Sequence, residues 1–542
     1  MSAQSSAESS SSSSSSVRRK AESTPSDPAA SQKRTKLESS ASQPMKCESD
    51  SATRIPLQRL ELRPDWESKV APIFNRVGAA AAANSASSST TKLRWLPVFG
   101  QQSSCHIGIF GNPFPSLPLD PKTRLKAAIF DLDGTLVVPK SGKIHPQRND
   151  EYDFKFMWSH SLKQVQDEHR IHGRMVVIVT NQGYFKPGGG RERDLSVWKA
   201  KQANIGAALE VPHVVLVATG EDRFRKPAVG MWDAFWSVLL NGLHTQDLPE
   251  PSATPKYNPS TRRRARAPEG LTLPEVKITE IETQYFDAQE SFYVGDAAGR
   301  VGDHSDVDRK WAGNVGVRFY TPEQYFTEHK KEQPYKLSGW APSKSASESI
   351  QRNSLPLFSP TSTPLIPSTA EERNEDLILF VGPPGAGKTE FYKRHLKAWG
   401  YEWVNQDTLS NVDACVRAVK KNLQAGKGCV VDLRISNLSD NTNRNKKTRS
   451  LYIRLAEELG KQVRCFFFDV ERPLALHNNA FRANSGLEQG RSLVPVMAVH
   501  GYYSQLERPT RDEGFAEEPK HISWQYEETS EEKTRRYFMY YN

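Results

Sequence analysis

The stretch that most constrains the fold is LILFVGPPGAGKT, at residues 377–389. An apolar, β-favouring run ends there in a glycine-rich turn, and Lys388 and Thr389 open a segment with helical character. This is the pattern G-x-x-x-x-G-K-[ST], with the strand before it and the helix after it that the pattern requires. In such a loop, backbone N–H groups surround phosphate oxygens at the positive end of a helix. The sequence therefore predicts a site for a nucleoside triphosphate.

Each part of this loop has an expected task. Lys388 can reach the β- and γ-phosphates of ATP, and the Thr389 hydroxyl can bind Mg²⁺. The alternative is a glycine-rich turn that binds nothing, and the complete set of strand, loop and Lys-Thr pair argues against it. The expected ATP-binding residues are Gly382, Pro383, Pro384, Gly385, Ala386, Gly387, Lys388 and Thr389.

Length and charge limit the class of protein. A chain of 542 residues is too long for a single core, so we expect two or three domains together with disordered segments. The 73 basic and 63 acidic residues give a net charge of +10, which permits a polyanionic partner without requiring one. Five cysteines without metal-ligand spacing are typical of reduced, intracellular thiols. No apolar run reaches the length of a membrane span, so no membrane partner is expected.

Residues 1–91 are predicted to form a disordered tail rich in serine and alanine. The first 53 residues contain no aromatic residue, so they cannot bury enough apolar surface to offset the entropy of ordering. Basic clusters at residues 18–20 and 33–36 have the pattern of a bipartite nuclear import signal. A solvated basic tail is the alternative, and the import signal favours a nuclear location.

Four strands in the first half of the chain each end at residues of a type that handles phosphate. The strands are expected at residues 126–130, 175–179, 214–218 and 291–294. The residues that follow them are, in order, Asp131 and Asp133, Thr180 and Asn181, Lys226, and Asp296. Because α/β sheets bind ligands at the carboxyl ends of parallel strands, we expect these side chains to converge.

This order of motifs resembles that of the haloacid-dehalogenase-like (HAD-like) phosphatases. The resemblance implies that Asp131 is the nucleophile that forms an aspartyl-phosphate, and that Asp133 protonates the leaving oxygen and then activates water. It implies that Asp131, the Asp133 carbonyl and Asp296 hold Mg²⁺. The phosphoryl oxygens would be bound by Thr180, Asn181 and Lys226.

Two features of this half leave alternatives open. Asp303, Asp306 and Asp308 could each orient the metal-binding carboxylates, and their spacing does not choose among them. The Pro- and Arg-rich insertion at 241–279 is either a solvated loop, which its composition favours, or a salt-sensitive contact to a phosphate backbone.

The second half alternates strands and helices, which is typical of a parallel sheet with crossover helices. A Ser- and Pro-rich linker is predicted at 331–372, and the P-loop domain at 373–542. Further strands are expected at residues 402–404, 428–431 and 463–468. The aromatic stretches at 522–526 and 537–541 have β character and are read as an extra packed strand.

Together the two halves resemble the eukaryotic bifunctional polynucleotide kinase 3′-phosphatases, over about residues 92–517. The motifs that carry the resemblance are FDLDGTL from Phe130, TNQG from Thr180, RKP from Arg225, GDAAGR from Gly295, the P-loop, DNTN from Asp440, and HNN from His477. The implied fold class is α/β, with a HAD-like phosphatase domain at 92–330 followed by the P-loop kinase domain. A forkhead-associated domain has no room in the tail, as in a fungal-type member.

The resemblance also assigns roles in the kinase half. It implies that Asp407 accepts the proton of the 5′-hydroxyl and that Arg482 reaches the transferring phosphate. Gln406 and Ala480 stand where the family commonly has arginine, which removes two phosphate contacts. Residues 433–439 separate the strand from DNTN, and are either a tolerated loop or sequence absent from the mature message.

The resulting hypothesis is a DNA-end repair enzyme. It would hydrolyse 3′-phosphates and, with ATP and Mg²⁺, phosphorylate 5′-hydroxyls, which leaves ends that a ligase can join. The expected partners are DNA with 3′-phosphate or 5′-hydroxyl ends and other strand-break repair proteins, and we expect a nuclear monomer. One alternative is an RNA-end healing enzyme with the same chemistry. Another is a phosphatase whose weakened kinase half serves as a repair scaffold.

Overall fold

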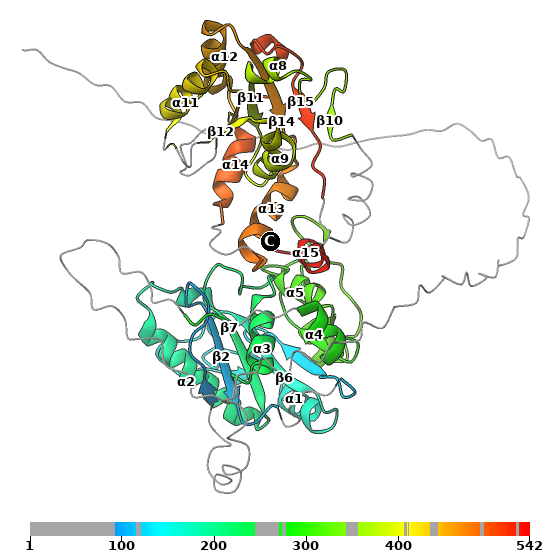
Figure 1. The fold of residues 1–542 in the computed structure, drawn as a ribbon. Coiled ribbons are helices and arrows are strands. Elements are labelled where there is room, and N and C mark those ends of the chain that lie inside the picture. Colours follow the sequence, from blue (N-terminus) through cyan, green and yellow to red (C-terminus); the bar gives the residue numbers. More distant parts are fainter. Residues whose placement is uncertain are drawn as a thin grey trace, which may run out of the picture. The chain divides into compact units, whose positions relative to one another are not determined.

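The computed structural model describes residues 93–114, 121–243, 270–273, 278–342, 356–405, 409, 411–433, 443–487, 493–526 and 530–542. All of them lie in one compact unit that spans residues 80–542 (Figure 1). The predicted tail at 1–91 and most of the insertion at 241–279 lie outside the described residues. Gln406, Asp407 and residues 434–442 also lie outside them.

The first half of the described chain builds a seven-stranded sheet. In sheet order its strands are β1 (Leu93–Trp95), β2 (Cys105–Phe110), β7 (His213–Ala218), β6 (Met175–Asn181), β3 (Ala127–Phe130), β8 (Phe292–Val294) and β9 (Arg318–Tyr320). The strands from β7 to β9 run parallel, whereas β1 and β2 add an antiparallel edge. Because β3 lies between β6 and β8, the residues that follow these three strands meet at one edge. A small pair, β4 (Val137–Val138) and β5 (Lys155–Phe156), follows the Asp131 motif.

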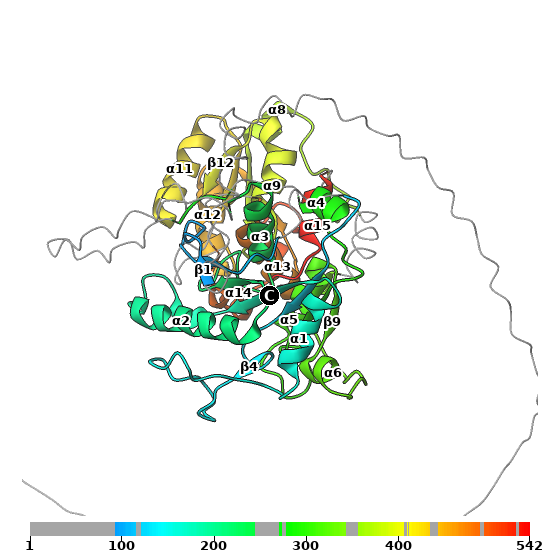
Figure 2. The same ribbon diagram turned by 90° about the horizontal axis from the view of Figure 1, so that it is seen from below.

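Helices cover both faces of this sheet (Figure 2). The helices are α1 (Ser161–Arg170), α2 (Glu192–Leu209), α3 (Gly230–Leu240), α4 (Ile278–Tyr285), α5 (Val307–Val315) and α6 (Pro322–Phe326). On one face, Phe130 packs in a core cluster with Trp198 of α2. On the other, Ile129 belongs to a cluster with Trp232 of α3 and Trp311 of α5. The continuous apolar runs that marked these strands are therefore explained by burial on both faces.

The second half builds a six-stranded sheet around the P-loop strand (Figure 1). In sheet order its strands are β10 (Phe358–Ser359), β15 (Lys520–Ile522), β14 (Gln462–Phe467), β11 (Asp376–Val381), β13 (Cys429–Asp432) and β12 (Glu402–Asn405). All pairs are parallel except β10 with β15. The helices are α8 (Ala370–Asn374), α9 (Lys388–Phe391), α11 (Val412–Gln424), α12 (Lys446–Glu458), α13 (Arg472–Asn484), α14 (Val496–Ser504) and α15 (Glu531–Tyr537).

The predicted fold class, an α/β phosphatase-type sheet followed by an α/β P-loop sheet, is confirmed. Two details differ. The stretch predicted as a linker at 331–372 supplies β10, which pairs with β15. The strand predicted at 537–541 is wrong, because α15 ends at Tyr537 and the last residues form no strand.

Clear helix signals define α15, which shares Tyr537 alone with the predicted strand. The side chain of Ser530 accepts a hydrogen bond from the Lys533 amide, which caps the helix, and two glutamates occupy the first turn. Glu532 and Arg536 form an ion pair one turn apart. Among the helices in the described ranges, none combines the length and apolarity needed to cross a bilayer.

Candidate active sites

Three carboxylates meet at the carboxyl edge of the first sheet. Asp131 directly follows β3, and its amide donates to the Val294 carbonyl at 2.8 Å. Asp296 follows β8, and Asp308 lies in the first turn of α5. One oxygen from each of the three side chains lies within 4.8 Å of the others. The convergence of Asp131 and Asp296 predicted from the sequence is therefore present.

Lys226 joins the three carboxylates. Its Nζ lies 2.7 Å from both Asp131 Oδ1 and Asp308 Oδ1, and the residue is 3 % exposed. The Val179 carbonyl and the Tyr293 hydroxyl complete its surroundings at 2.9 and 2.8 Å. The ammonium is thus held by groups from β3, β6, β8 and α5, and its position is set by the sheet.

The protonation behaviour of this cluster follows from burial and crowding. Burial raises the pKa of Asp131 well above its usual value, and although Lys226 opposes this, Asp308 and Asp296 add to it. Burial and the Asp308 charge raise the pKa of Asp296 to about 6. Burial alone would lower the pKa of Lys226, but Asp131 and Asp308 outweigh it, so the pKa is raised and the lysine stays charged.

The residues present fit a magnesium ion. Three carboxylates face one ammonium, so the cluster carries excess negative charge that a divalent cation would balance. All the donors are oxygens, the ligands that Mg²⁺ prefers. Gly134 has φ +80°, and a Cβ there would lie 2.5 Å from Asp296 Oδ2, so the loop backbone comes close to this carboxylate. A larger residue at position 134 would collide with the cluster.

Asp133 lies at the exposed side of the cluster. Its Oδ2 accepts a hydrogen bond from Gln182 Nε2 at 2.7 Å, and Gln182 also donates to Thr180 Oγ1 at 3.0 Å. Thr180 itself is buried at the end of β6. Gln182 therefore links the predicted acid–base residue to the predicted phosphate ligand. The sequence contained Gln182 within the TNQG motif but gave no reason to assign it a role.

Asn181 is placed differently from the phosphate contact predicted for it. Its Oδ1 accepts from the Lys226 amide at 2.9 Å, and its Nδ2 donates to the Lys226 carbonyl at 3.1 Å. Both ends of the side chain are thus engaged with the main chain of Lys226. The geometry makes Asn181 the residue that fixes the turn from which the lysine extends.

Hydrogen bonds and ion pairs distinguish the three downstream carboxylates, Asp303, Asp306 and Asp308. Asp308 bonds Lys226 and Tyr293, whereas Asp303 pairs with Arg300 at 3.0 Å. Asp306 pairs with Lys310 at 3.0 Å and accepts from the Ser338 amide. Asp308 is therefore the one that belongs to the cluster.

The P-loop lies between β11 and α9 in the second sheet. Gly385 and Gly387 both have φ of +84°, the left-handed region that favours glycine. A Cβ at Gly385 would lie 2.5 Å from the Ala475 carbonyl of α13, so the loop packs directly on that helix. Lys388 is buried and donates to the carbonyls of Gly382 and Pro383 at 2.9 and 3.1 Å.

Asp432 is a residue near this loop that the sequence interpretation did not assign. It is the last residue of β13, is fully buried, and has Oδ1 3.7 Å from Lys388 Nζ. A carboxylate at the end of the strand beside the P-loop strand is the group that holds Mg²⁺ in P-loop enzymes. The signal in the sequence was the apolar run that ends in Asp432. The inserted residues after it directed attention to Asp440, which lies outside the described residues.

The remaining predicted kinase residues are placed as follows. Thr389 is half-buried in α9, and Arg482 is half-buried in α13. Ala480, where arginine is common in the family, is 2 % exposed and packs in a hydrophobic core. Asp407 lies outside the described residues, so its predicted role as base stays a prediction.

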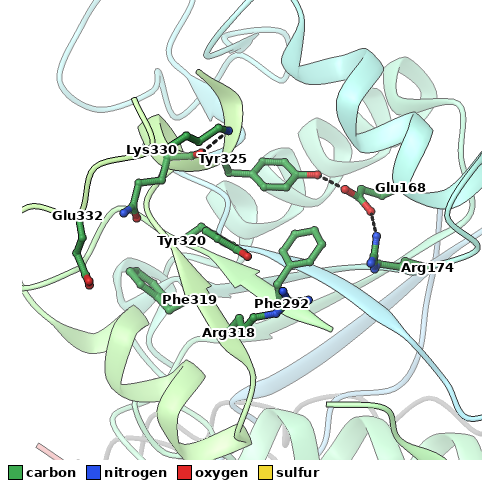
Figure 3. Close-up of a pocket in the computed structure, with 10 residues that line it drawn as sticks. Glu168, Arg174, Phe292, Arg318, Phe319, Tyr320, Tyr325, Lys330 and Glu332 are labelled. Carbon is green, nitrogen blue, oxygen red and sulfur yellow. Dashed lines mark hydrogen bonds and ion pairs between the residues drawn. The ribbon is translucent and has the colours of Figure 1, made fainter. Parts of the chain in front are cut away.

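A pocket of about 630 Å³ lies beside the edge strand β9 (Figure 3). Glu168 on its wall accepts from Arg174 at 2.6 Å and from the Tyr325 hydroxyl at 2.5 Å. Among the described residues, none of the predicted site residues lines this pocket. Arg174 already neutralises the charge of the buried Glu168, and both residues line the pocket. We therefore assign the pocket no part in the chemistry.

Family models match both halves of the chain. The model described as polynucleotide kinase 3 phosphatase matches residues 126–247 and 262–326. A model described as an AAA domain matches residues 377–509. The two matched regions contain, respectively, the carboxylate cluster with Lys226 and the P-loop with Asp432.

Relatives in other organisms match different shares of this chain. The bifunctional polynucleotide phosphatase/kinase of Schizosaccharomyces pombe is 28 % identical over 395 residues, which is 73 % of this chain and 79 % of that protein. A putative bifunctional polynucleotide phosphatase/kinase of Acanthamoeba polyphaga mimivirus is 27 % identical, over 66 % of this chain and 75 % of that protein. The polynucleotide 3′-phosphatase ZDP of Arabidopsis thaliana is 27 % identical over 37 % of this chain and 24 % of that protein.

Proposed function

We propose that this chain, which belongs to the family of bifunctional polynucleotide phosphatase/kinases, repairs DNA ends by removing 3′-phosphates and phosphorylating 5′-hydroxyls. The observation that carries the proposal is the convergence of Asp131, Asp296, Asp308 and Lys226 in a chain that also holds a complete P-loop. The products, a 3′-hydroxyl and a 5′-phosphate, are the two groups that a ligase joins.

The phosphatase step uses Asp131 as the nucleophile. An Oδ of Asp131 forms a bond to phosphorus while the bond from phosphorus to the 3′-oxygen breaks, and Asp133 gives its proton to that oxygen. Asp133, now a carboxylate, then takes a proton from water as the water attacks the aspartyl-phosphate and returns Asp131. Two observations support these roles: Asp131 is fixed within the cluster, and the exposed Asp133 is oriented by Gln182.

In this step, Lys226 and the metal would stabilise the negative charge on the transferring phosphate. Lys226 is held by Asp308, Tyr293 and the Val179 carbonyl and also bonds Asp131, which places its charge beside the oxygens of a phosphate on that carboxylate. Asp131 and Asp296, with Asp308 behind them, would hold Mg²⁺, which supplies charge neutralisation on the phosphate when bound. The Asp133 carbonyl remains the further metal ligand implied by the family resemblance.

The kinase step is supported by the P-loop and its neighbours. Loop amides and Lys388 would hold the β- and γ-phosphates of ATP, and Thr389 with Asp432 would hold Mg²⁺. In the family, a carboxylate at the position of Asp407 accepts the proton of the 5′-hydroxyl as its oxygen attacks the γ-phosphorus. Arg482, on the same helix that packs against the P-loop, is the expected cation on the transferring phosphate.

The proposal is tested by measuring both reactions on matched ends. Oligonucleotides carrying a 3′-phosphate or a 5′-hydroxyl are offered as DNA and as RNA of the same sequence, with ATP labelled at the γ-phosphate. Release of phosphate from DNA 3′ ends and transfer of label to DNA 5′ ends support the proposal. Faster turnover of the RNA strands would instead make this an RNA-end healing enzyme. Absence of label transfer from the wild-type protein would favour a scaffold role for the second half.

The nucleus is the proposed location, because the two basic clusters at residues 18–20 and 33–36 have the spacing of an import signal. A fluorescent fusion of the full chain should accumulate in nuclei. Replacing the basic residues of both clusters with alanine should distribute it evenly through the cell. Nuclear accumulation of that variant would contradict the assignment.

A further inference from the structure

The C-terminal segment, residues 536–542, is buried at four of its seven residues. Tyr537, Met539 and Tyr541 are 2, 5 and 6 % exposed and belong to the core cluster that also contains Trp232 and Phe481. The segment begins with the last two residues of α15, drawn in red in Figure 1. Aromatic burial alone would explain its packing. Its polar groups, however, make two sets of contacts that packing does not require.

The first set reaches the P-loop. The Tyr537 hydroxyl donates to Asn478 Oδ1 at 2.8 Å, and Asn478 Nδ2 donates to the Gly385 carbonyl at 2.9 Å. Because Tyr537 occupies the oxygen of the amide, the nitrogen is directed at the loop. Gly385 sits in the left-handed region against α13, so the bond from Asn478 holds the loop at its tightest turn.

The second set reaches the turn that carries Lys226. Asn314 Nδ2 donates to the Pro227 carbonyl at 2.7 Å and to the Tyr540 carbonyl at 2.8 Å. Its Oδ1 accepts from the Tyr540 amide at 2.7 Å. The main chain of Tyr540 therefore bonds both ends of the Asn314 amide, and that same amide bonds Pro227, the residue after Lys226. Asn314 thus contacts this turn from α5, while Asn181 contacts it from β6.

A third contact keeps the segment in place. The Arg536 guanidinium donates to Asp233 Oδ2 at 2.8 Å, and both residues are buried. It also donates to the Ser485 carbonyl at 3.1 Å. Arg536 thus connects the start of the segment to α3 and to the residue that follows α13. Two further charges support this pair, because Arg536 also bonds Glu532 at 2.6 Å and Asp233 lies 3.8 Å from Arg223.

We propose that the C-terminal segment is a positioning element for both active sites. Tyr537 orients Asn478 on the P-loop, and Tyr540 orients Asn314 on the Lys226–Pro227 turn. Neither tyrosine touches a phosphate, so each acts through an asparagine as a positioning residue. The inference rests on the proposed function only for the names of the two reactions. The contacts themselves concern how well ATP is held and how well Lys226 is placed.

The P-loop arm is tested with Tyr537→Phe, which keeps the ring and removes the hydroxyl. Without the hydroxyl that donates to its Oδ1, Asn478 can turn its amide, so the loop binds nucleotide less well. We expect the dissociation constant of ATP and its KM to rise about 3- to 10-fold, as for loss of one hydrogen bond. The kcat of the kinase and the release of 3′-phosphate should change less than about twofold, because Asn314 and Lys226 keep their partners.

A matched control is Tyr526→Phe. Tyr526 stacks on Tyr537 with ring centroids 4.3 Å apart, but its hydroxyl is 3.4 Å from the side chain of Thr534 in α15. It should leave the ATP dissociation constant unchanged. If ATP binding weakened equally in both phenylalanine variants, or did not weaken in Tyr537→Phe, the proposed role of Tyr537 at the P-loop would be overturned. Titration with ATP alone measures how well the P-loop binds nucleotide, even if no polynucleotide were phosphorylated. The test therefore separates this inference from the proposed function.

The phosphatase arm is tested with a double-mutant cycle. Asn314→Ala and a chain ending at Met539 each remove the contact between Asn314 and Tyr540. We expect each to lower kcat for 3′-phosphate release about 10-fold with KM for the DNA changed little, and the combination to fall no further. Losses that multiply would show independent effects and overturn the arm. A KM effect without a kcat effect, or a kcat loss that only follows a lower melting temperature, would also overturn it.

Discussion

The buried lysines of the two sites, Lys226 and Lys388, are held in opposite ways. Lys226 lies 2.7 Å from each of two carboxylates, whereas Lys388 donates to two neutral carbonyls of its own loop and has one carboxylate, Asp432, at 3.7 Å. The first lysine is held within a cluster of carboxylates that come from the ends of β3 and β8 and from α5. The second belongs to a loop that can offer its ammonium to a nucleotide. A site that forms a covalent bond to its own carboxylate needs the fixed arrangement, while a site that binds a polyphosphate needs available donors.

The largest expected effect comes from removing the nucleophile. Asp131→Ala should lower 3′-phosphate release at least about 10⁴-fold, since no other group can form the covalent intermediate. Phosphorylation of 5′-hydroxyls should stay within about twofold, because Asp131 belongs to the first sheet alone. Rates are measured on separate 3′-phosphate and 5′-hydroxyl DNA strands. Retained phosphate release would contradict the assignment of Asp131.

The choice among the downstream carboxylates predicts a second contrast. Asp308→Asn should reduce phosphatase activity at least about 100-fold, because it weakens the hold on Lys226 and removes charge from the metal cluster. Asp303→Asn, which disturbs the pair with Arg300 and the hydrogen bonds from the Ala298 and Arg300 amides, should cost less than about fivefold. Steady-state kinetics at saturating Mg²⁺ distinguish the two. Equal losses would mean that the cluster extends to Asp303.

The two lysines should differ in stability as well as in activity. Lys226→Met leaves Asp131 and Asp308 buried without their cation, so we expect a loss of about 3–5 kcal/mol in the free energy of unfolding. Lys388→Met, which removes hydrogen bonds to two carbonyls, should cost about 1–3 kcal/mol. Denaturant unfolding of both variants gives the comparison. A larger cost at Lys388 would show that Asp432 depends on it more than the distances indicate.

The smallest expected effect concerns Asn181. Asn181→Ala removes two hydrogen bonds to the Lys226 main chain, so the phosphatase rate should fall about 10- to 100-fold while the kinase is unaffected. If Asn181 bound phosphate directly, KM for the 3′-phosphate end would rise along with the loss. A fall in kcat alone is the signature of a misplaced lysine.

Much of the phosphatase site could be predicted because sheet topology constrains it. Asp131, Thr180 and Asp296 each follow a parallel strand, and neighbouring parallel strands bring their carboxyl ends together whatever the loops do. The sequence could not identify Asp308 as the third carboxylate of the cluster. That assignment depends on which nearby cations form ion pairs with Asp303 and Asp306. Both pairs are local, at spacings of three and four residues, but those spacings alone do not show that the pairs form.

Two other features could not be predicted from the sequence. The side chain of Asn181 has the chemistry of a phosphate ligand, and only the approach of the Lys226 turn, 45 residues later, shows what it binds. Residues 537–541 were read as a strand because aromatic residues favour β structure. The structure instead ends α15 at Tyr537, and Met539 and Tyr541 after it pack in a core cluster without pairing to a strand.

The central claim, two separate phosphate-handling sites in one chain, is tested most directly by mixing two variants on one substrate. A nicked DNA duplex with a 3′-phosphate and a 5′-hydroxyl at the nick is incubated with ATP, Mg²⁺ and a DNA ligase. We expect neither Asp131→Ala nor Lys388→Ala to permit sealing alone, and the mixture of both to restore it. Sealing by either variant alone, or failure of the mixture while wild type succeeds, would contradict the account.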